Sequence, residues 1–209
     1  NVRKNVYRGQ YSYQAPGYYT ISMQDLNRNG GINNIPNSIN IPFYITTTLL
    51  VDPSVGTNSS PELIYPPIDN GCTFKKFVHN PSAYDPDGDS LYYELCEILA
   101  GGGQGGGGCN AVVPNPACPP PYTGVPLIMP FTPTDPMPAN PILSIAGQTG
   151  LLTGIPNATG QYVVGICVSE YRNGLFLSNV RLDYQFNVAN CGRPISDMVT
   201  PVEDPTIMC

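Results

Sequence analysis

The chain contains no tryptophan, one histidine and few charged residues. Of its 209 residues, nine are lysine or arginine and 15 are acidic, so charged residues make up only 11% of the sequence. Long helices draw heavily on Glu, Lys and Arg, together with Ala and Leu. The scarcity of these charged helix formers argues against a helical bundle.

The chain also lacks a basic patch and a long apolar run. Its net charge is −6, and Lys75-Lys76 is its only pair of adjacent lysines. Nucleic-acid binding through phosphate neutralisation is therefore excluded as a function. No run of about 18 apolar residues is present, so we expect no membrane span. The first residues lack the apolar segment of a signal peptide, so an export signal would lie outside them.

Cysteine is frequent, but its spacing excludes the common metal and redox motifs. Seven cysteines are present, and no C-x-x-C pair occurs. Zinc ribbons and thioredoxin-like sites are therefore not supported. We interpret the cysteines as disulfide partners in an oxidising compartment. The alternative is that they are buried free thiols, which behave as small core residues.

Glycine and proline are abundant, with 22 and 24 residues, while 41% of the chain is hydrophobic. The high content of glycine and proline predicts many turns, and the hydrophobic content argues against disorder. Alternating apolar residues at regular spacing predict an all-β protein of the sandwich type. The predicted strands lie at 19–23, 42–51, 74–79, 91–95, 161–169 and 180–188, and a hairpin is predicted within 142–154.

One stretch carries a family resemblance. Residues 83–93 read AYDPDGDSLYY. They resemble the A-x-D-x-D-G-D-x-L-x-Y signature of bacterial cadherin-like modules. Downstream, 144–152 resembles the hairpin of those modules and 160–164 resembles the start of their strand F. The resemblance covers about residues 58–192 and implies a cadherin-like β-sandwich with a long glycine- and proline-rich loop at 100–130.

The N-terminal part carries a second resemblance. Tyr13, Pro16-Gly17 and Tyr19 lie in a pattern similar to polycystic-kidney-disease-like repeats. Residues 1–57 are thus interpreted as an incomplete Ig/PKD-like module or its C-terminal half, and 193–209 as a linker or the start of a further module. The expected fold is Ig-like/cadherin-like β-sandwich modules in tandem, similar to repeats of large cell-surface proteins of gliding and related Bacteroidota.

The aspartates of this signature form a candidate calcium site. Asp85, Asp87 and Asp89 place three carboxylates within five residues, and calcium prefers oxygen ligands. The cadherin-like resemblance implies that Asp85, Asp87 and Glu170 bind Ca²⁺, with Asp89 more important for the turn. The linker at 58–61 lacks the aspartate of cadherin linkers, which lowers the expected number of ligands. The alternative is that these aspartates cap backbone amides of a turn.

The sandwich topology also suggests how the cysteines pair. The first strand of the second module and the last strand end at the same end of the domain, which predicts a Cys72–Cys191 disulfide. A Cys109–Cys118 disulfide is predicted to close the glycine-rich loop, with Cys96–Cys118 as its rival.

The resemblance implies a non-enzymatic, structural or adhesive module of a secreted multi-domain adhesin or extracellular filament at the cell surface. The implied partners are other copies or neighbouring modules of the same protein. His79, Glu97 and Asp135 are interpreted as structural rather than catalytic residues. Two alternatives stay open: a module that binds surface polysaccharide through loops at 101–130, and an accessory domain of a secreted hydrolase.

Overall fold

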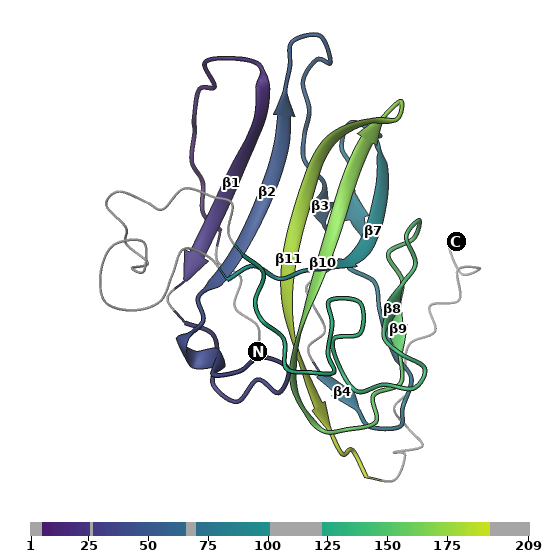
Figure 1. Ribbon diagram of the computed structural model, residues 1–209. Helices are drawn as coiled ribbons and strands as arrows, with labels where there is room; N and C mark the ends of the chain where they lie inside the picture. Colours follow the sequence, from purple (N-terminus) through teal and green to yellow (C-terminus); the bar gives the residue numbers. More distant parts are fainter. Residues whose placement is uncertain (1–5, 26, 66–69, 101–122, 193–209) are drawn as a thin grey trace, which may run out of the picture.

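The computed structural model describes residues 6–25, 27–65, 70–100 and 123–192 (Figure 1). Within these ranges the chain is built from strands, and the helical element is the single turn η1 at Ser38–Asn40. No helix there is long and apolar enough to cross a membrane. The predicted all-β class is confirmed. The predicted Cys109–Cys118 disulfide and the segment 193–209 lie outside the described residues.

A six-stranded main sheet dominates the structure. Its strand order is β1-β2-β11-β10-β7, and β4 pairs in parallel with the end of β11. These strands are β1 (Gly17–Asp25), β2 (Phe43–Val51), β4 (Asn70–Cys72), β7 (Ser90–Cys96), β10 (Gly160–Arg172) and β11 (Leu175–Ala189). A three-stranded sheet consists of β5 (Phe77–His79), β9 (Leu152–Gly154) and β8 (Ser144–Ile145), and β3 (Glu62–Leu63) pairs with β6 (Ala83–Tyr84).

The two longest strands, β10 and β11, form an antiparallel hairpin at the centre of the main sheet (Figure 1). Asn173 and Gly174 connect them, with φ angles of 51° and 83°. Positive φ at two consecutive residues is what a tight hairpin turn requires, and Asn-Gly adopts it readily. Both strands were predicted from their alternating apolar residues, and both extend further than predicted.

Strand β10 is buried on both faces because a layer covers each side of the sheet there. On one face, Val164 and Ile166 pack with Leu152 of the three-stranded sheet in the larger core cluster. On the opposite face, Val163 is in a second cluster, since side chains alternate along a strand. The buried members of that second cluster are Ile32, Ile35, Ile41, Ile98, Val125 and Val163.

The N-terminal part of the chain shares this sheet and core. Residues 46–49 of β2 pair with 178–181 of β11. The loop that follows β1 covers the second face, where the Asn34 amide donates to the Val163 carbonyl (2.7 Å) and accepts from the Val163 N–H (2.9 Å). Residues that the sequence analysis assigns to two modules thus lie in one continuous sheet, and the tandem arrangement stays a prediction.

Two disulfides join described residues, which indicates an oxidising compartment. Cys72 pairs with Cys191, as predicted, and links the end of β4 to the residues after β11. Cys96 pairs with Cys167, so the rival pairing Cys96–Cys118 was wrong. The reason is the β7–β10 register, which places Cys96 opposite Gly165. Cys167 lies two residues beyond Gly165 and therefore on the same face of the sheet as Cys96. A Cβ atom at Gly165 would lie 2.2 Å from the Cys96 carbonyl oxygen, so only glycine fits there.

The burial of β9 can be tested with two adjacent leucines. Leu152 is fully buried in the larger core cluster, whereas Leu151 is 41% exposed. We expect Leu152→Ala to lower the free energy of unfolding by about 2–5 kcal/mol, because it leaves a cavity. The matched Leu151→Ala variant should change it by less than about 1 kcal/mol. Urea unfolding followed by circular dichroism measures both, and equal losses would contradict this register.

Candidate functional site

Three acidic side chains meet at the end of the main sheet that lies opposite the Cys72–Cys191 disulfide. Asp85 and Asp89 flank the turn before β7, and Glu170 lies near the end of β10. The β7–β10 register places Glu170 opposite Leu91, next to that turn. One carboxylate oxygen from each of the three residues lies within 4.8 Å of the others. This acidic cluster is the strongest candidate site in the described part of the chain.

Asp85 organises the turn itself. One of its carboxylate oxygens, Oδ1, accepts hydrogen bonds from the backbone N–H groups of Asp87 (2.9 Å) and Asp89 (3.0 Å). This is the turn-capping role that the sequence left open as an alternative to calcium binding. The side chain is buried, and among the described residues its second oxygen, Oδ2, has no hydrogen-bond partner.

Glu170 is completely buried. It continues the row of core-facing side chains of β10, which is apolar up to this position. Its Oε2 atom accepts hydrogen bonds from the Ser178 hydroxyl and from the Asn58 amide at 3.0 Å. Its Oε1 atom has no hydrogen-bond partner among the described residues. Burial raises the pKa of Glu170 to about 7; the bonds from Ser178 and Asn58 oppose this rise, and the nearby Asp85 carboxylate adds to it.

Asp89 is paired with a cation from the chain itself. The Arg172 guanidinium donates through Nε to Asp89 Oδ1 (2.8 Å) and through NH2 to Asp89 Oδ2 (2.6 Å). This two-pronged arrangement is the strongest common form of the Arg–carboxylate pair. The hydrogen bonds from Arg172 lower the pKa of Asp89.

Asp87 lies apart from the other three predicted ligands. Its Oδ2 atom accepts a hydrogen bond from the Ser59 N–H at 2.6 Å and lies 3.9 Å from Arg172 NH2. The structure therefore groups Asp89 with Asp85 and Glu170, whereas the resemblance favoured Asp87 as the ligand. Asp87 holds the segment before β3 instead.

Three further members of this site, Arg172, Asn58 and Ser178, were not predicted from the sequence. Ser178 meets Glu170 across the β10–β11 hairpin, so its contact depends on the exact register of that hairpin. Asn58 comes from the segment that follows β2, and its contact with Glu170 is long-range. Arg172 carries a weak sequence signal: it follows Glu170 by two residues, as one of the chain's few basic residues.

As arranged here, the cluster leaves few oxygen atoms free for a calcium ion. Calcium takes six to eight oxygen ligands. Asp89 engages both its oxygens with Arg172, and Asp85 engages one with backbone amides. Among the described residues, the buried oxygens of the cluster without hydrogen bonds are Asp85 Oδ2 and Glu170 Oε1. Calcium binding by Asp85, Asp87, Asp89 and Glu170 stays an untested prediction.

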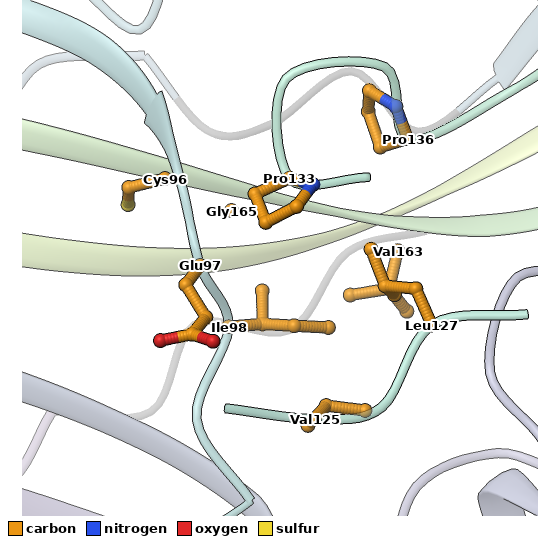
Figure 2. A pocket seen from close by; sticks show the side chains of 9 residues that line it. All are labelled: Cys96, Glu97, Ile98, Val125, Leu127, Pro133, Pro136, Val163 and Gly165. Carbon is orange, nitrogen blue, oxygen red and sulfur yellow. The ribbon is translucent and has the colours of Figure 1, made fainter. Parts of the chain in front are cut away.

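A second feature, a small hollow beyond the end of β7, offers no room for a substrate. It holds about 10 Å³, the room of about one water molecule. Figure 2 shows its lining side chains: Cys96, Glu97, Ile98, Val125, Leu127, Pro133, Pro136, Val163 and Gly165. Asp135 does not line it and instead forms a turn with Thr132. His79 is buried against the Tyr184 ring, and this burial lowers its pKa.

Comparison with protein-family models, with curated proteins and with solved structures finds no match for this chain. The cadherin-like and PKD-like resemblances therefore stay predictions from short motifs.

The raised pKa of Glu170 predicts a pH dependence of stability. The folded protein holds this proton more tightly than the unfolded chain, because the pKa rises from 4.5 to about 7 on folding. The stabilisation is therefore complete below pH 4.5 and is lost as the pH rises through 7. Between pH 5 and 8 the free energy of unfolding of the wild-type protein should therefore fall by an amount on the order of 1–3 kcal/mol. Thermal unfolding of Glu170→Gln over the same pH range should not show this fall. Glu94→Gln, at an exposed position of β7, should retain it; parallel pH profiles for wild type and Glu170→Gln would contradict the assignment.

Proposed function

We propose that the chain is a non-enzymatic structural and adhesive module of a secreted multi-domain cell-surface adhesin or extracellular filament. One observation carries the proposal. The core-facing side of the main sheet continues over β1 and β2 as an apolar face, exposed at Ile21 and Met23, beyond the three-stranded sheet that covers β10 and β11.

The registers define this apolar face. Val180 of β11 lies opposite Thr47 of β2, and Thr47 lies opposite Ile21 of β1. Val180 is also on the same side of β11 as Leu182, which packs against the larger core cluster. The face comprises Tyr19, Ile21, Met23, Ile45, Leu49, Val180 and Leu182. Ile21 and Met23 are 55% and 43% exposed, so covering them removes apolar surface from water.

Strand β1 also lies at the edge of the sheet. Within the described residues it pairs only with β2, through nine residue pairs. A long edge strand can add a strand from another polypeptide by backbone hydrogen bonding. An apolar face beside such an edge suits a second copy of the chain or a neighbouring module of the same protein. The two disulfides suit the proposed extracellular location, where thiols are oxidised.

Carbohydrate binding is a second candidate function, supported by a polar hollow on the other face of the sheet. Its polar lining side chains are Asp25, Asn27, Arg28, Asn29, Asp183 and Gln185, beside the Phe43 ring. Amides next to an aromatic ring suit the hydroxyl groups and apolar faces of sugars, whereas the Asp183 carboxylate is held by Arg28 at 2.6 Å. Most of the long loop predicted to bind polysaccharide lies outside the described residues. The role of accessory domain in a secreted hydrolase stays an alternative.

The apolar face can be tested by its effect on self-association. We expect the wild-type protein to associate with rising concentration in sedimentation-velocity experiments. Ile21→Lys should weaken this association about tenfold or more, because it places a charge within an apolar contact. Its matched control is Ser22→Lys, an exposed change on the opposite face of the same strand, which should associate like the wild type.

Circular dichroism should show that both variants stay folded, since both positions are exposed. A wild-type protein that stays monomeric at high concentration, or equal association of both variants, would argue against this function.

A further inference from the structure

The oxygen atoms around Arg172 form a cation cage that the chain itself fills. We infer that the Arg172 guanidinium is the resident cation at this end of the molecule and stands where a divalent metal ion would otherwise bind. The inference goes beyond the proposed function, and it holds whether or not the chain assembles with other copies.

Five oxygen atoms accept hydrogen bonds from the guanidinium. Two belong to Asp89, at 2.8 and 2.6 Å. Two are the backbone carbonyl oxygens of Val55 (3.0 Å) and Thr57 (3.2 Å), which accept from NH1. The fifth is the Asn58 side-chain oxygen, which accepts from NH2 at 3.0 Å. A sixth oxygen, Asp87 Oδ2, lies 3.9 Å from NH2.

The number of these acceptor oxygens matches the number of guanidinium donors. A guanidinium has five N–H groups, and each of its three nitrogen atoms makes hydrogen bonds here. The oxygens are also of the types that calcium takes, namely carboxylate, backbone carbonyl and side-chain amide oxygens. The cage therefore has the ligand chemistry of a calcium site, while its centre is occupied by a charged group of the protein.

The contacts of Arg172 join three parts of the chain. Arg172 ends β10, Asp89 precedes β7, and residues 55–58 lead from β2 towards β3. Asn58 also donates to Glu170, and Ser59 donates to Asp87, so the same segment is held at both sides of the guanidinium. A bound metal ion would make the same connection and could be removed by a chelator. The guanidinium makes the same connection as part of the chain, so a chelator cannot remove it.

Removing the guanidinium should convert the cage into a metal site. The wild-type protein should show the same melting temperature in EDTA and in about 10 mM calcium, and no calcium binding by isothermal titration calorimetry. Arg172→Ala should melt several degrees lower in EDTA. It should recover by about 3–10 °C in calcium and bind one ion with a Kd of about 0.1–1 mM.

Two further variants complete the test. Arg8→Gln, a change at an exposed arginine, should behave as the wild type in both buffers. Arg172→Lys keeps the charge but not the planar set of donors, so it should lose stability without gaining calcium affinity. The inference is overturned if the wild-type protein binds calcium or is stabilised by it. It is also overturned if folded Arg172→Ala binds no calcium. The wild-type measurement decides the first point even if every Arg172 variant fails to fold.

Discussion

The antiparallel pairing of β10 with β11 is the constraint on which the other features depend. Its register places Val164 opposite Tyr184 and Tyr162 opposite Phe186, which puts four large side chains on one face. Because side chains alternate along a strand, a shift of β11 by one residue would turn its polar residues, such as Asp183, towards the larger core cluster. Strands β2, β4 and β7 each pair with β10 or β11, and β1 joins the sheet through β2. Both disulfides involve β10 or the residues just after β11.

The candidate site is an extension of the same pairing. The core-facing row of β10 runs through Val164, Ile166 and Val168 and then reaches Glu170, opposite Ser178. A carboxyl group at this position is buried because it continues an apolar row. That burial is also the main cause of its raised pKa. A β-bulge directly after Glu170 changes the register before Arg172, and bulges commonly re-aim the side chains that follow them.

Groups of the chain itself cross-link both ends of the main sheet. The Cys72–Cys191 disulfide closes one end, and the hydrogen bonds of Arg172 close the other. Between these ends, the apolar side of β1 and β2 remains exposed at Ile21 and Met23. Rigid ends and an open apolar face suit the proposed role in an extracellular assembly. This role demands a stable shape and a surface that another module can cover.

Local patterns in the sequence determined the all-β class, the central strands and the short hairpin of β8 and β9, because alternation and turn residues act over a few positions. The sandwich topology expected for the chain placed Cys72 and Cys191 at one end of the fold. Only the tertiary structure decided the Cys96–Cys167 pair and the oxygen cage of Arg172. Both depend on strand register and on contacts between residues more than 70 positions apart, which composition and spacing do not encode.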